Sequence, residues 1–227
     1  MAILATRTLN YVDDHGVMKD VTMTLLKRIE QDGTWKLGLR FGAPITWEMF
    51  IRGDDVLETI TSILAAWWVR LFVGGMPIAN NIRWIDGQGK ESFNCGLPAL
   101  RKRPDTWTAE AIPPTEKNPG NLEILSESTA PFPDRTGVEQ ERPVFVFMPQ
   151  QMTDGRWRCG FAFDAKDTAP IRYGVGDDWI QAFLDAAAMI RVVYESMLPQ
   201  GWKPRDGIGL EMLPYKMGRG YFIDERE

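Results

Sequence analysis

Two copies of the tripeptide Gly-Asp-Asp, at residues 53–55 and 176–178, are the residues of this chain best suited to chemistry. Neighbouring carboxylates can hold the metal ions of a polymerase-type active site. Here, however, each copy opens a long segment of helical periodicity, and Asp55 and Asp178 are each followed three residues later by Glu or Gln. This is the spacing of a capping box, in which side chains satisfy free N–H groups at a helix start. The motif therefore predicts two helix starts and no metal site.

The residue types that serve most often as bases, nucleophiles and metal ligands are few and scattered. His15 is the single histidine and lies in a predicted turn, and Cys95 and Cys159 lack the C-x-x-C spacing of a zinc site. One histidine in a turn also gives little support for hydrolase chemistry based on serine or cysteine. We therefore predict no catalytic residue, no cofactor and no metal ligand.

These residues belong to a chain that repeats itself. Residues 32–41 read DGTWKLGLRF and residues 154–163 read DGRWRCGFAF. In both copies apolar side chains alternate with polar or small ones, which is typical of a strand with one buried face. The leading Asp-Gly predicts a hairpin turn. Because Cys159 takes the place of Leu37, we expect it to be a buried, unreactive thiol.

The sequence around each repeat predicts the same series of elements. A strand precedes the Asp-Gly turn, a third strand follows the repeat, and a helix begins after Gly-Asp-Asp. A short hairpin then closes each unit, at residues 84–89 and 202–209, and the first unit has an extra leading strand at 6–12. The predicted fold class is α+β: two related units, each an antiparallel β-meander of three or four strands followed by one long helix and a short hairpin, packed as an intrachain pseudo-dimer.

Apolar stripes with helical period mark the two predicted helices. The first stripe is formed by Leu57, Ile60, Leu64, Trp67, Trp68 and Leu71. The second is formed by Ile180, Phe183, Ala187, Ile190, Tyr194 and Met197. Residues 1–100 then make up the first unit and residues 143–227 the second. Residues 101–142, which are rich in Pro, form a linker or an arm packed over one repeat, with a candidate short strand at 122–125.

The composition of the chain argues against several classes of function. The chain has 227 residues, a net charge of −5 and a pI of about 5.1, which argues against general nucleic-acid binding. The most apolar run, residues 63–72, is too short to span a membrane. The N-terminal residues do not resemble a signal peptide, and two cysteines suit a reducing compartment. We therefore expect a cytoplasmic protein that binds neither nucleic acid nor membrane.

The order of strand, D-G-x-W strand, third strand, capped helix and W-x-D-G hairpin resembles a family of small bacterial α+β domains of unknown function. The residues that carry the likeness are 5–11, 32–41, 53–71 and 83–89, and a looser copy spans 140–215. Such domains are similar in size and style to bacterial immunity proteins, the antidotes that bind secreted toxins. The resemblance implies a protein-binding function, although similarity of fold alone does not define a function.

The first functional hypothesis is accordingly a non-enzymatic, immunity-type protein that binds and neutralises a cognate toxin. An acidic inhibitor is steered quickly onto a basic target, so a basic toxin domain is the expected partner. Tryptophan is enriched at binding hot spots, and carboxylates suit a basic surface. The residues proposed to contact the partner are Trp47, Trp68, Trp107, Trp179, Asp13 and Asp14.

Two other classes of function stay open. An enzyme or a small-ligand-binding protein would use a cleft between the repeats, with Asp13, Asp14, Arg205 and Asp206 as its polar residues. A structural component of a phage or a secretion system would instead assemble into rings or filaments. The oligomeric state does not follow from the sequence.

Overall fold

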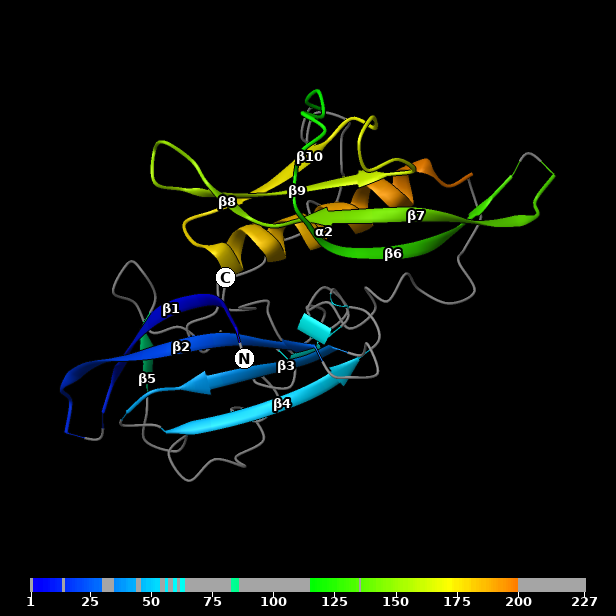
Figure 1. Ribbon diagram of the computed structural model, residues 1–227. Coiled ribbons are helices and arrows are strands. Elements are labelled where there is room, and N and C mark those ends of the chain that lie inside the picture. The colour runs from blue at the N-terminus through cyan, green and yellow to red at the C-terminus, as the bar shows by residue number, and fades with distance from the viewer. Residues whose placement is uncertain are drawn as a thin grey trace, which may run out of the picture.

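The computed structural model describes residues 2–13, 15–29, 35–43, 46–53, 56, 59–60, 62–63, 83–85, 115–134 and 136–199. In this part of the chain two antiparallel sheets lie on opposite sides of one long helix, α2 (Trp179–Met197), as Figure 1 shows. Side chains from both sheets and from α2 form one continuous hydrophobic core. The two halves of the chain are therefore parts of a single packed structure.

The first sheet comes from the N-terminal half. Its strands are β1 (Ala2–Val12), β2 (Met18–Ile29), β3 (Trp35–Phe41), β4 (Trp47–Gly53) and β5 (Arg83–Ile85). They are ordered β4-β3-β2-β1-β5, and each neighbouring pair is antiparallel. Leu37, Leu39 and Phe41 on β3 are buried, whereas Arg40 between them is exposed. The strand predicted from alternation at 35–41 is confirmed.

The second sheet repeats this arrangement. Its strands are β6 (Ile124–Pro133), β7 (Glu139–Phe147), β8 (Gln150–Gln151), β9 (Trp157–Phe163) and β10 (Arg172–Gly176). The order is β10-β9-β7-β6, and the short β8 pairs with β9. Strands β6, β7, β9 and β10 thus correspond to β1, β2, β3 and β4. Cys159 and Leu37 occupy equivalent positions and both are fully buried, as the sequence comparison predicts.

The candidate short strand at 122–125 overlaps the start of strand β6, but the sequence pattern does not predict the rest of it. Pro131 and Pro133 argue against the interior of a sheet, but β6 is the last strand in the order of its sheet, where proline is tolerated. Its sequence repeats that of β1: Ile124-Leu125 stands where β1 has Ile3-Leu4, and both strand pairs shift register at this point. The second sheet therefore begins inside residues 101–142, the stretch interpreted as a linker or arm.

Helix α2 begins as the capping-box spacing predicts. The Asp178 carboxylate accepts a hydrogen bond from the Gln181 N–H at 2.8 Å, and the Gln181 amide oxygen accepts one from the Asp177 N–H at 3.0 Å. Of the predicted apolar stripe, Met197 is exposed and the other members are buried. Buried side chains occur on several sides of α2, because a helix packed between two sheets has little surface exposed to solvent. They are Trp179, Ile180, Ala182, Phe183, Leu184, Ala186, Ala187, Met189, Ile190, Val193 and Tyr194.

Two glycines allow α2 to approach the second sheet closely. A Cβ atom on Gly174 would lie 2.0 Å from the Ala186 backbone nitrogen, and one on Gly176 would lie 2.5 Å from the Ala182 nitrogen. Neither contact is possible without moving the helix backbone. Both glycines are on β10, so this strand presents bare backbone to α2.

The predicted α+β fold of two helix-bearing units is wrong. The described residues are 53% strand and 18% helix, and they contain two sheets with the single complete helix α2. Of the first predicted stripe, Ile60 is helical and buried, and Leu57, Leu64, Trp67, Trp68 and Leu71 lie outside the described residues. The nearby Val56 and Ile63 are also helical and buried in the shared core. The strand content is higher than predicted because β1, β2 and β6 are ten to twelve residues long. Most of the two closing hairpins lies outside the described residues; β5 overlaps the first of them and pairs with β1.

Candidate functional site

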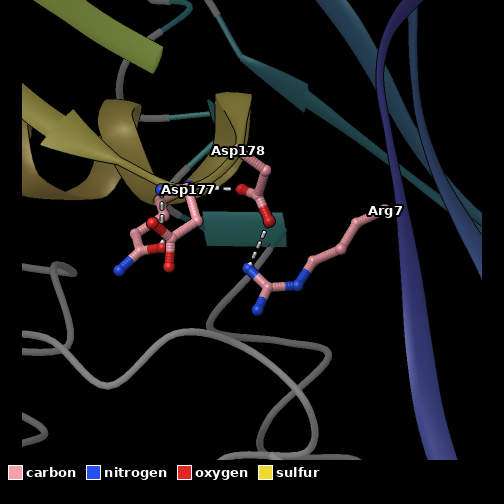
Figure 2. A network of polar contacts seen from close by, with 4 residues as sticks. Arg7, Asp177 and Asp178 are labelled. Atoms are coloured by element: carbon pink, nitrogen blue, oxygen red, sulfur yellow. Dashed lines mark hydrogen bonds and ion pairs between the residues drawn. The ribbon is translucent and has the colours of Figure 1, made fainter. Parts of the chain in front are cut away.

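The two halves of the molecule meet in an ion pair between β1 and the start of α2. Arg7 extends from β1 toward Asp178, and its Nη1 atom lies 2.8 Å from Asp178 Oδ2 (Figure 2). The other carboxylate oxygen of Asp178 caps the helix through the Gln181 N–H. Asp178 therefore performs two structural tasks at once, since it caps the helix and pairs with a cation of the other sheet.

Burial weakens the proton affinity of this arginine, and the neighbouring carboxylates oppose that effect. Burial lowers the pKa of the Arg7 guanidinium, whereas the charges of Asp178 and Asp177 raise it. An arginine stays protonated in proteins under all ordinary conditions. Although Nη1 is within 2.8 Å of Asp178, it makes no hydrogen bond of good geometry with the described residues. We treat the contact as an ion pair that joins the two sheets.

Nucleophile and metal chemistry find little support in the described part of the chain. The Cys159 Sγ lies 3.4 Å from the Phe147 carbonyl oxygen, and burial raises the pKa of this thiol far above its ordinary range. Among the described residues no three His, Cys, Asp or Glu side chains come together as a metal site. Cys95 and the Asp54-Asp55 pair lie outside the described residues.

The turn between β1 and β2 is a more specific surface feature. The Asp13 Oδ1 atom accepts hydrogen bonds from the backbone N–H groups of His15, at 3.0 Å, and Val17, at 2.9 Å. The Asp13 Oδ2 atom lies 2.5 Å from Lys19 Nζ. The Lys19 contact, followed by the Val17 N–H, lowers the pKa of Asp13 to about 2. Asp13 therefore fixes the shape of this turn.

Two apolar side chains are exposed on this fixed turn. Val17 is 51% exposed and Met18 is 58% exposed. Scattered single apolar residues are normal on a protein surface, but two adjacent ones at the end of a long hairpin form a protruding patch. We call Val17 and Met18, with Asp13 beside them, the first hairpin tip. In Figure 1 this turn extends beyond the sheet on the left.

The hairpin of β6 and β7 ends in a turn of the same construction. Asp134 Oδ1 accepts hydrogen bonds from the N–H groups of Thr136, at 2.7 Å, and Val138, at 3.0 Å. Val138 is 59% exposed, as Val17 is in the first turn. We call Asp134 and Val138 the second hairpin tip. The sequence signal for this pair is Asp-x-x-Gly-Val, at 13–17 and 134–138, which lies outside the repeats at 32–41 and 154–163.

The six residues proposed for partner binding fall in different environments. Trp179 is buried against Phe183 with its ring stacked, and Trp47 is half-buried with its ring centroid 5.8 Å from that of Phe41. Asp13 lies at the first hairpin tip. Trp68, Trp107 and Asp14 lie outside the described residues. Of the residues suggested for a cleft between the repeats, Asp13 is at the tip of a hairpin and Asp14, Arg205 and Asp206 are outside the described residues.

Comparisons of this chain with protein-family models, with curated proteins and with solved structures found no match. In the described part of the chain no helix has the length and apolar character needed to cross a membrane.

Proposed function

We propose that the protein is a non-enzymatic binding module of the immunity type, which acts in the bacterial cytoplasm by binding and neutralising a cognate toxin. The observation that supports this proposal is the first hairpin tip, where Val17 and Met18 are both more than half exposed on a turn held by Asp13. Asp13 fixes the backbone of this turn, so binding costs little backbone freedom there and burial of the two apolar side chains contributes more fully to affinity.

The charge of the chain suits a basic partner. The net charge is −5, and an acidic protein associates quickly with a basic one because the attraction guides their encounter. In this proposal Val17 and Met18 bury apolar surface at the centre of the contact, and the net negative charge of the chain favours the approach. A basic toxin domain encoded near this protein is the expected target.

The test is co-expression of the chain with each product of the neighbouring genes, followed by purification of complexes and assay of toxin survival. The variant Met18→Asp places a charge in the proposed contact and should weaken toxin binding at least tenfold, as loss of a hot-spot residue does. Val138→Asp, at the equivalent position of Val17 in the second tip, serves as the matched control and should bind normally.

Two outcomes would count against the proposal. Failure of the chain to bind or neutralise any neighbouring gene product would remove the immunity function. Equal effects of Met18→Asp and Val138→Asp on a complex that does form would show that the first hairpin tip does not carry the contact.

A further inference from the structure

The end strands of the two sheets differ in how they are protected against pairing with another chain. An end strand has backbone N–H and C=O groups to which a further strand can bond, and proteins block such edges with prolines, short strands or covering segments. In the second sheet Pro131 and Pro133 remove N–H groups from β6, and residues 115–123 cover the start of β10 through the bridge between Glu116 and Ile171. In the first sheet the end strand β5 is three residues long.

Strand β4, at the other end of the first sheet, has none of these features within the described part of the chain. It is seven residues long, contains no proline, forms a regular register with β3, and pairs with no other described strand. Figure 1 shows it in cyan as the outermost strand of its sheet. Its apolar side chains Trp47, Met49, Phe50 and Ile51 are only half-buried. A regular apolar edge of this kind is a site to which another strand can add.

The hydrogen bonds of β3 show which backbone groups of β4 point outward. The Gly42 N–H donates to the Thr22 carbonyl oxygen at 3.0 Å, on the side of β2. Because the direction alternates along a strand, Phe41 directs its N–H and C=O toward β4, where it pairs with Trp47. The same alternation along β4 turns the N–H and C=O groups of its even-numbered residues away from β3. These residues are Glu48, Phe50 and Arg52, and we call them the β4 edge.

The charges of the β4 edge are complementary to those of a second copy. If two β4 strands pair antiparallel around a two-fold axis at Phe50, Glu48 of each copy lies opposite Arg52 of the other. Opposite charges in directly facing positions stabilise an antiparallel pair, and like charges destabilise it. Both side chains are exposed. Within its own chain Glu48 contacts Arg40 through Oε1, at 2.7 and 2.8 Å, and a carboxylate has enough acceptor sites for two cations.

We infer that the protein forms a symmetric dimer in which two β4 edges pair antiparallel, so that the first sheets of two copies form one continuous sheet. Each facing pair of the β4 edge then exchanges two backbone hydrogen bonds. On the inner face Met49 of each copy lies opposite Ile51 of the other, which adds apolar contact. The positions of Glu48 and Arg52 on either side of Phe50 favour a second copy over an unrelated strand. This surface is separate from the first hairpin tip and does not depend on the toxin proposed above.

The first experiment measures the association of the full chain by analytical ultracentrifugation over a range of concentrations. The natural chain should dimerise reversibly. Glu48→Arg and Arg52→Glu each place like charges opposite one another, and each should raise the dissociation constant of the dimer at least tenfold. An equimolar mixture of the two variants should form a mixed dimer, because one chain then has two cations and the other two carboxylates at the facing positions. Met18→Asp, at the first hairpin tip, is the control and should dimerise normally.

The second experiment locates the contact and uses the natural chain alone, so that it does not depend on the folding of any variant. Hydrogen exchange at the amides of Glu48, Phe50 and Arg52 should become slower as the protein concentration rises, because these N–H groups are bonded only in the dimer. The amides of Met49 and Ile51, which bond to β3 in both states, should change less.

Several results would overturn the inference. The natural chain could stay monomeric up to about 1 mM, or exchange at the β4 edge could be independent of concentration. The dimer could also withstand both charge reversals, or the two variants, shown to be folded by circular dichroism, could fail to form a mixed dimer. Each of these results would mean that two copies do not pair through the β4 edge.

Discussion

The two sheets present similar inner faces to the core and different outer faces to their surroundings. Leu37, Leu39 and Phe41 on β3 correspond to Cys159, Phe161 and Phe163 on β9, and all are buried. The outer faces diverge, because the positions of Phe145, Ala162 and Ile171 in the second sheet are taken by Thr24, Arg40 and Glu48 in the first. A shared core keeps both copies of the unit apolar inside, whereas the outer face of the second sheet has apolar residues where residues 115–123 pack on it.

The same contrast applies to the glycines. Gly174 is on the inner face, where the backbone of α2 is in contact with it, and Gly38 is on the outer face beneath the Phe50 ring. A helix backbone cannot move without disturbing the core, but the end of a half-buried ring can turn. Substitutions therefore test which face is structurally constrained.

The largest loss of stability is expected for Gly174→Ala. The new Cβ would lie 2.0 Å from the Ala186 nitrogen, so α2 must shift and the free energy of unfolding should fall by about 3 kcal/mol. The matched variant is Gly38→Ala, whose Cβ has ring atoms of Phe50 as its nearest neighbours, and about 1 kcal/mol is expected there. Urea denaturation of both variants measures the difference, and equal midpoints would contradict the assigned roles of the two faces.

A smaller effect is expected at the covered outer face. Ile171 is fully buried beneath the 115–123 segment, and Ile171→Ala should lower the free energy of unfolding by about 2 kcal/mol. Glu48 holds the same position on the first sheet, is exposed, and forms an ion pair with Arg40 at 2.7 Å. Glu48→Ala should change stability by less than about 0.5 kcal/mol. A loss at Glu48 as large as that at Ile171 would show that both outer faces are covered alike.

A buried amide helps to hold residues 115–123 on the second sheet, together with the backbone bridge between Glu116 and Ile171. Asn118 Nδ2 donates to the carbonyl oxygens of Lys166, at 2.7 Å, and Ala169, at 3.3 Å. Asn118→Ala should cost about 1 kcal/mol and loosen the segment locally. Hydrogen exchange of the Glu116 and Ile171 amides, which form the bridge, should become faster while exchange in β3 does not change. Unchanged protection of these two amides would mean that the bridge is held by other contacts.

The sequence predicts the parts of this fold that are encoded locally. Alternation identifies β3 and β9, the capping box identifies the start of α2, and the comparison of the repeats identifies Cys159 as a buried side chain. These features depend on residues within a few positions of one another. Most of strand β6, beyond the candidate at 122–125, was missed because its prolines weaken the local signal, and its place at the sheet edge allows those prolines.

The features that depend on distant contacts could not be predicted. Arg7 and Asp178 are far apart in the sequence, and neither residue type by itself indicates a partner in the other half. The cover over the second sheet has the composition of a Pro-rich linker, so that only the structure shows Glu116 beside Ile171. The paired hairpin tips do have a signal in the sequence, because Asp-x-x-Gly-Val is as local a motif as the repeats.

The smallest effect is expected on the pKa values of the aspartates at the two hairpin tips. Lys19 and Gln140 hold equivalent positions, and each donates to the turn aspartate, Lys19 to Asp13 and Gln140 to Asp134. The lysine contact is the largest cause of the low pKa of Asp13, about 2, whereas the Thr136 side chain is the largest cause of the lowered pKa of Asp134. Since the pKa of Asp13 is below its ordinary value of 3.8, its contribution to stability is present above about pH 4 and is lost as the pH falls toward 2.

Lys19→Gln makes the first tip resemble the second and should raise the pKa of Asp13 without changing that of Asp134. NMR titration of the side-chain carboxyl carbons measures both groups in one sample. Added salt should raise the pKa of Asp13 more than that of Asp134, because an exposed ion pair is screened and a hydrogen bond from a neutral hydroxyl is not. If salt moves both pKa values equally, the two tips are held by the same forces and the difference assigned to Lys19 does not exist.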